Sequence, residues 1–342
     1  MKPPAGAAPE DAPQSDSSAR VIPPAVESSG TIPKIPESVS GSTAALALLT
    51  SALWGGTPTA IRFTTDTLPP VMVAAIRFGL AALFMLAWVR FEGVGLRIQK
   101  GQWKPILIAS AMLFVQIVTF NIGVATSNSS HGSLFINTFL FWVGPIEHFV
   151  TRTDRLTWRK ALGLLIAGVA SFGVLAADGR PASGGVAARD QVTLYGDLIL
   201  LCSGLILGIK IVYTKHAVRT VEPGKLIYWH DVFGTLLFLV YSFSFESTRL
   251  GGFTTPAIIG LLYQGILVGG LCFAIQALQL KQYSASQIAV FSASTPLFGI
   301  LFGWLLRGDP LSGWLLAAAA GVAWGILLVT RKSIFPGRRQ RA

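Results

Sequence analysis

Residues 70–89 read PVMVAAIRFGLAALFMLAWV, an apolar run in which Arg77 carries the only charge. A run of this length can span the hydrocarbon core of a bilayer as an α-helix, which rises about 1.5 Å per residue. A helix is favoured because lipid offers the backbone no hydrogen-bonding partner. The stretch therefore predicts a membrane-spanning helix with one charge well inside it.

The rest of the chain repeats this pattern. Only 13% of its 342 residues are charged, against about 25% in a soluble domain, and the mean hydropathy is +0.59. The alternating short segments of a membrane β-barrel are absent from the sequence. The sequence predicts an all-α integral membrane protein with ten transmembrane helices. The other nine lie near 44–62, 105–125, 131–150, 160–177, 195–214, 225–245, 255–279, 285–305 and 311–330.

The two ends of the chain differ from these runs. Residues 1–42 are rich in Pro, Ser, Ala and Gly, which predicts a disordered cytoplasmic tail, and residues 332–342 form a short basic tail. With the N-terminus inside, the loops, helix ends and C-terminal tail hold seventeen Lys and Arg on the inner side and five on the outer side. The positive-inside rule then places both termini in the cytoplasm, with the helices in a plasma (bacterial inner) membrane. The net charge of +11 is thus attributed to topology, and no nucleic-acid partner is expected.

The chain also matches itself at an offset of about 153 residues. Because the matches keep one order, they predict two repeats of five helices, 43–178 and 193–331. Five is odd, so the second repeat enters the membrane from the opposite face, as in many secondary transporters. The matched pairs are Gly55 with Gly208, Pro70 with Pro223, 120–122 with 273–275, and Asp154-Arg-Leu-Thr with Asp309-Pro-Leu-Ser.

Several of these residues resemble one known family. They are Leu53-Trp54-Gly55-Gly56, the segment 68–78 with its Ala-Ile-Arg-Phe, and the two acidic turns at Asp154 and Asp309. The pattern is similar to the EamA-type branch of the drug/metabolite transporter superfamily, over about residues 44–331. The departures are Asp in place of Glu in both turns, and Pro145, which lies four residues later than its counterpart Pro296 when the two acidic turns are aligned. The resemblance implies export of amino acids or other small metabolites, usually without ATP.

Motifs for other chemistry are weak. The sequence has no GxxxxGK[ST] signature and no HExxH, so neither ATP-driven pumping, a metal site nor a cofactor is predicted. The Ser-rich segment 127–133 with His131 is the nearest candidate for catalysis, but Ser and Asn at a helix start more often cap the helix. A secondary transporter for a small-molecule substrate is favoured. An integral membrane enzyme and a scaffold without transport activity are the alternatives.

Polar residues inside the predicted spans are the site candidates, because burying them in lipid is costly. Arg77 matches His230 at the same offset, and with Asp231 these are predicted to support the site. Lys210, Glu147 and His148 are interpreted as residues that snorkel toward a membrane surface. The substrate-binding candidates lie on helices that the resemblance implies line a central cavity, or they only bridge helices. They are Trp54, Asn121, Asn137, Trp142, Gln264, Gln276 and Gln287.

Four GxxxG pairs let helices approach closely. Three are predicted to pack within the chain: Gly204/Gly208, Gly265/Gly269 and Gly299/Gly303. The fourth, Gly321/Gly325, lies in the last predicted helix and is a candidate contact for a homodimer.

Overall fold

The structure is a computed structural model. It describes residues 40–151, 192–247, 252–282, 291–292, 294–311 and 313–334, with Met1 and single positions at 158, 162, 165, 166 and 169. The chain divides into two units, Met1–Lys34 and Ile35–Ala342, and every helix described lies in the second. These residues form helices and turns and no strand, which confirms the all-α prediction. The acidic turn at Asp154 and Gln287 lie outside the described residues, as does most of the predicted span 160–177.

Six helical stretches in the described ranges are long and apolar enough to cross a membrane. This length and composition are those of the helices of an integral membrane protein. The stretches are Gly41–Thr65, Pro70–Phe91, Trp103–Thr126, Leu194–Ala217, Pro223–Phe245 and Thr255–Gln276, and the apolar helix Thr295–Arg307 is shorter.

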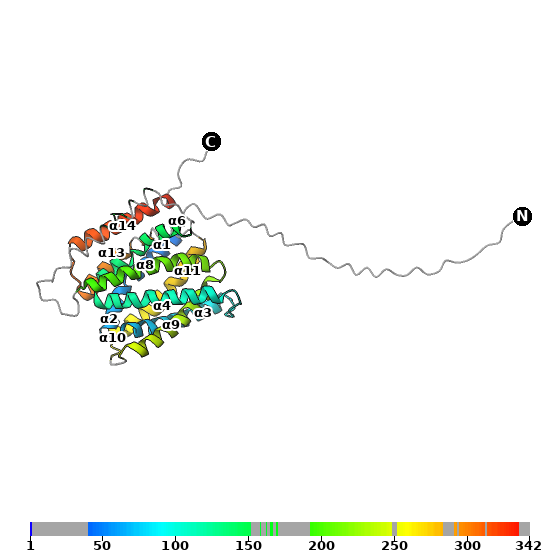
Figure 1. Cartoon of the computed structure of the whole chain (residues 1–342), viewed down its shortest axis with the longest axis horizontal. Coiled ribbons are helices and arrows are strands. Elements are labelled where there is room, and N and C mark those ends of the chain that lie inside the picture. Colours follow the sequence, from blue (N-terminus) through cyan, green and yellow to red (C-terminus); the bar gives the residue numbers. More distant parts are fainter. Residues whose placement is uncertain are drawn as a thin grey trace, which may run out of the picture. The chain divides into compact units, whose positions relative to one another are not determined.

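Four long helices of the bundle pack as two pairs (Figure 1). Helix α3 (Pro70–Phe91) packs on α9 (Pro223–Phe245), and each begins with a proline, which suits the first helical turn. The rings of Phe78 and Phe238 stack between them at 5.5 Å. Helix α4 (Trp103–Thr126) packs on α8 (Leu194–Ala217), where Leu200 lies directly against Gly123.

Two predicted spans are interrupted. The span predicted at 44–62 divides into α1 (Gly41–Gly55) and α2 (Thr57–Thr65), where Pro58 enters the first turn of α2 without a backbone N–H. The span predicted at 131–150 divides into α5 (Ser129–Ile136) and α6 (Phe139–Phe149). Between them Asn137 Nδ2 donates to Ser133 O at 2.7 Å, and Thr138 Oγ1 donates to Phe135 O at 2.7 Å. These side chains compete with the helix for its own carbonyls.

A third span changes its helix type. After α10 (Thr255–Leu262) the backbone forms a π-helix, η2 (Tyr263–Cys272), and then returns to an α-helix, α11 (Phe273–Gln282). A π segment of ten residues is long for this rare form, which usually occurs as a single turn at functional sites. The apolar pattern of 255–279 predicted one regular helix, because hydropathy does not report helix type.

The three GxxxG pairs predicted to pack within the chain do so. A Cβ on Gly204 would lie 2.5 Å from Thr138 Oγ1, and one on Gly265 would lie 2.6 Å from Leu80 Cβ. Gly299, in α13 (Thr295–Arg307), faces Ser133 even more closely. The fourth pair lies on α14 (Gly313–Ile334), beside α13 at the edge of the bundle (Figure 1). A homodimer through Gly321 and Gly325 stays a prediction.

Candidate functional site

One end of the bundle is held by polar contacts between helices, which are buried or partly buried. We call it the Asp66 end, and it comprises residues 62–70, 125–131, 193–197, 246 and 307–309. Arg307 Nη1 lies 2.6 Å from Asp66 Oδ2, so the end of α13 is tied to the end of α2. Asp197 at the start of α8 accepts a hydrogen bond from Ser127 Oγ at 2.6 Å and lies 2.9 Å from His131 Nδ1. These contacts join both predicted halves.

The start of α5 carries the Ser-rich segment. Asn128 Oδ1 accepts a hydrogen bond from His131 N at 2.7 Å, so the side chain caps the helix as predicted. Asp309 Oδ2 accepts hydrogen bonds from Ser130 N and Ser130 Oγ, both at 3.0 Å. The acidic turn that follows α13 therefore also caps a helix of the first predicted half.

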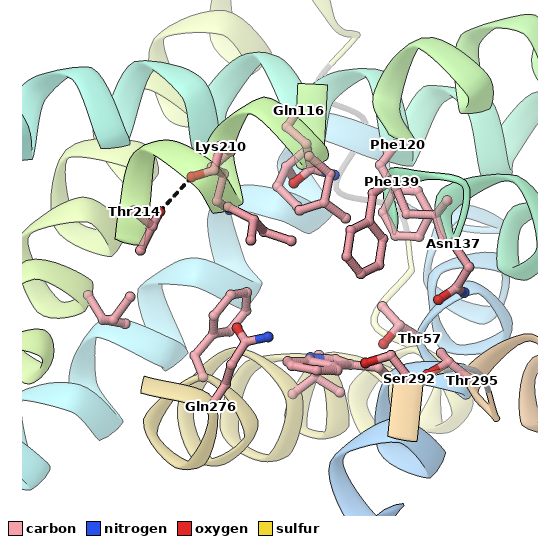
Figure 2. Close-up of a pocket in the computed structure, with 18 of the residues that line it drawn as sticks. Thr57, Gln116, Phe120, Asn137, Phe139, Lys210, Thr214, Gln276, Ser292 and Thr295 are labelled. Carbon is pink, nitrogen blue, oxygen red and sulfur yellow. Dashed lines mark hydrogen bonds between the residues drawn. The ribbon is translucent and has the colours of Figure 1, made fainter. Parts of the chain in front are cut away.

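A cavity lies between the central helices, beside the helix interruptions at Gly56 and Asn137 (Figure 2). Its empty space is about 1240 Å³, counting the part open to solvent. Side chains of both predicted halves line it. On α8 the lining runs from Leu207 to Val218, just past the last turn, whereas no described lining residue belongs to the Asp66 end. The cavity therefore extends from the middle of the bundle toward the opposite end, the Lys215 end, where Lys215 Nζ lies 2.7 Å from Glu147 Oε1.

Five predicted site residues line the cavity. Trp54, Asn137 and Gln276 contribute a large ring and two amides, and Arg77 and His230 contribute basic groups. Figure 2 shows Asn137 and Gln276 entering the cavity from different helices, together with hydroxyl side chains at Thr57, Ser292 and Thr295.

Three other candidates do not line it. Asn121 is fully buried, and its Nδ2 donates to Pro70 O at 2.8 Å, which joins α4 to the start of α3. Trp142 is 39% exposed, with its Cβ against Gly208. Gln264 is fully buried on η2, where its Oε1 lies 3.5 Å from Arg77 Nη1. Depth in a helix is visible in a sequence, but the direction of a side chain around a broken or π-helical axis is not.

A cluster of charged groups lies at one wall of the cavity. Arg77, Lys210 and Asp231 come from three different helices, are each at most 5% exposed and are close enough to interact electrostatically. His230 Nδ1 lies 2.8 Å from Asp231 Oδ1. The guanidinium of Arg77 also stacks on its neighbour Phe78, with Cζ 4.7 Å from the ring centroid.

The interpretation of Lys210 as a snorkelling residue was wrong. Its side chain lines the cavity, and Nζ lies 5.5 Å from the ring centroid of Phe273. It is only 5% exposed, whereas its neighbour Ile209 is 39% exposed. The sequence did offer a signal for this role, because Lys210 lies in the interior of the predicted span and not in its last turn.

Comparisons with known proteins agree with these features. The model described as "EamA-like transporter family" matches residues 41–176 and 194–331. An uncharacterized transporter of Bacillus subtilis, YoaV, is 27% identical over 81% of this chain and 93% of its own length. A protein of Salmonella typhimurium named as a probable amino-acid metabolite efflux pump is 22% identical over 83% of this chain and 93% of its own length.

A solved crystal structure has a similar fold. It superimposes with a TM-score of 0.66, at 17% identity, over 87% of this chain and 99% of that chain. At this level of identity the similarity concerns the fold alone.

Proposed function

The chain belongs to the EamA-like transporter family, and on that premise we propose that it is a secondary transporter that exports small metabolites, such as amino acids, by alternating access. The observation that carries the proposal is a central cavity between the predicted halves, lined by both aromatic and polar side chains and extending toward the Lys215 end. In this state the contacts at the Asp66 end close the other side.

The helix bounds support ten spans arranged as two inverted repeats. Gly41 and Leu194 are first residues of helices 153 residues apart, and so are Pro70 and Pro223. The next helix of each predicted half begins 152 residues apart, at Trp103 and Thr255. We propose repeats over 43–178 and 193–331, so that an opening at the Asp66 end would use helices related to those around the Lys215 end.

We propose a plasma-membrane location with both termini in the cytoplasm, which makes the Lys215 end the inner one. A reporter fused after Ala342 is then expected to read cytoplasmic, and the same reporter inserted within 181–188 is expected to read external. The two fusions control for each other's expression, and fluorescence or phosphatase activity measures their location. Both reporters on one side of the membrane would contradict the inverted arrangement.

Transport is tested with the purified full chain in liposomes loaded with a mixture of labelled amino acids and organic acids. Release of a solute with unchanged mass, faster than from loaded liposomes without protein, is the expected result. Chemical conversion of a solute or lipid without release would instead favour a membrane enzyme. The absence of both, in protein that remains folded, would favour a scaffold.

Gln276→Ala and Asn121→Ala are expected to have different effects, although both remove an amide. Gln276 lines the cavity, so its loss is expected to change the apparent affinity for the exported solute by about two- to tenfold at normal abundance. Asn121 lies away from the cavity and donates to Pro70 O, so its loss is expected to cost about 1 kcal/mol of stability with affinity unchanged. Concentration-dependent transport and thermal unfolding measure the two effects. Equal changes in both properties for both variants would refute this assignment.

A further inference from the structure

The cavity wall carries positive charge that its own negative charge does not balance. Among the described lining residues three are cationic, Arg77, Lys210 and Lys215, and none is Asp or Glu. Lys215 is paired with Glu147 at 2.7 Å. Arg77 and Lys210 share one carboxylate, that of Asp231, which lies behind the wall. Apart from His230, this part of the site therefore holds two cationic side chains and one carboxylate.

Lys210 is where this excess charge is least compensated. Its side chain is 5% exposed, and Nζ makes no hydrogen bond with the described part of the chain. The nearby face of Phe273 attracts a cation but accepts no conventional hydrogen bond. Burying an ammonium without a hydrogen-bond acceptor costs free energy. A ligand group that accepts a hydrogen bond from Lys210 Nζ would therefore bind strongly in this low-dielectric site.

The remaining wall defines the body of the ligand. Trp54, Phe120, Phe139 and Phe273 present broad apolar surfaces, and the other polar groups are neutral amides and hydroxyls apart from His230 (Figure 2). An excess of one cationic side chain over the carboxylates matches a monoanion. A phosphate monoester, with close to two negative charges at neutral pH, would remain undercompensated.

We propose that the exported substrate is a small organic carboxylate, and that its carboxylate binds Lys210 with support from Arg77 while its apolar part packs on the aromatic wall. The inference rests on the proposed function and names the substrate class of the same cavity. An amino acid and a simple organic acid share this chemistry, whereas an amine that lacks the carboxylate is repelled.

Four probes with one phenyl skeleton separate these cases: L-phenylalanine, 3-phenylpropanoate, 3-phenylpropanamide and 2-phenylethylamine. Each is added to the purified full chain, and the unfolding temperature is measured. We expect stabilisation by at least one of the two carboxylates and by neither the amide nor the amine. Phenylalanine alone identifies an amino-acid site, and phenylpropanoate alone identifies an organic-acid site. Stabilisation by the amide or amine, or by none of the probes, overturns the proposal without requiring any variant.

Lys210→Met tests the residue itself. It removes the ammonium and keeps an unbranched apolar side chain, so the apparent affinity for the stabilising carboxylate is expected to fall at least about tenfold. Lys225→Met is the matched control, because Lys225 is also buried, at 3% exposure, but does not line the cavity. Unchanged affinity in Lys210→Met overturns the proposal. If wild-type liposomes release none of the solutes, the proposed function fails separately.

Discussion

Gly299→Ala is expected to remove most of the folded protein from the membrane. Gly299 lies where α13 crosses α5, and a Cβ at this position would overlap both Oγ and Cβ of Ser133. These atoms are held close to the backbone, so no rotamer change avoids the overlap and the two helices must separate. Overpacking of this kind costs about 1–3 kcal/mol or more. Membrane abundance and the unfolding temperature measure the effect.

Two further variants make this test specific. Gly79→Ala is the control, because a Cβ there meets nothing closer than Thr235 Cγ2 at 3.7 Å, and its expected effect is a small gain from helix propensity. Ser133→Gly removes both overlapping atoms and is expected to restore part of the stability lost in Gly299→Ala. Normal stability of Gly299→Ala, or no recovery in the double variant, would show that the helices do not cross as closely as described.

Asp231→Asn is expected to destabilise the protein by about 3–5 kcal/mol, because it leaves two buried cations without their shared carboxylate. Arg77→Gln alone is also expected to be destabilising, since Gln264 then loses its charged partner. The double variant is expected to lose less than the sum of the two single variants, as for groups that interact directly. The two single variants and the double variant form a double-mutant cycle with the wild type. Their thermal unfolding in one detergent measures the interaction between Arg77 and Asp231.

The control for this cycle is Glu222→Gln. It removes a carboxylate near the start of the same helix, but Glu222 is 53% exposed and lies 3.9 Å from Lys225, so its expected cost is below about 1 kcal/mol. Additive losses in the double variant would show that Arg77 and Asp231 act independently. A loss in Glu222→Gln as large as that in Asp231→Asn would show that burial does not decide the effect.

Much of the fold could be predicted from the hydropathy of the sequence and from the positions of its prolines. The spans expected at 70–89 and 225–245 are observed as Pro70–Phe91 and Pro223–Phe245, because long apolar runs with a proline at the start leave few alternatives. The break at Gly56 and the π-helix were missed. Gly56 and Pro58 mark the break in the sequence, whereas the π-helix lies in a stretch as apolar as a regular helix, which hydropathy cannot distinguish.

The site was harder to predict than the fold. Intramembrane polarity selected Arg77 and Gln276, which line the cavity, but it also selected Asn121, which joins two helices. Lys210 was passed over because its distance along the helix resembled that of a residue near a membrane surface. Whether a buried polar group faces a cavity or another backbone depends on its angle around the helix axis, and a break of one or two residues changes that angle.

The number of residues in the π-helix η2 determines which side chains face the cavity. Removing one residue from Tyr263–Cys272 and letting the helix continue as α would turn all that follows by about 100°. Phe273 and Gln276 would then leave the wall that they now share with Lys210, although neither had been altered. A single-codon deletion in this stretch would therefore change the ligand specificity as surely as a substitution inside the cavity. The cavity wall thus depends both on which residues stand at 273 and 276 and on how many residues precede them in η2.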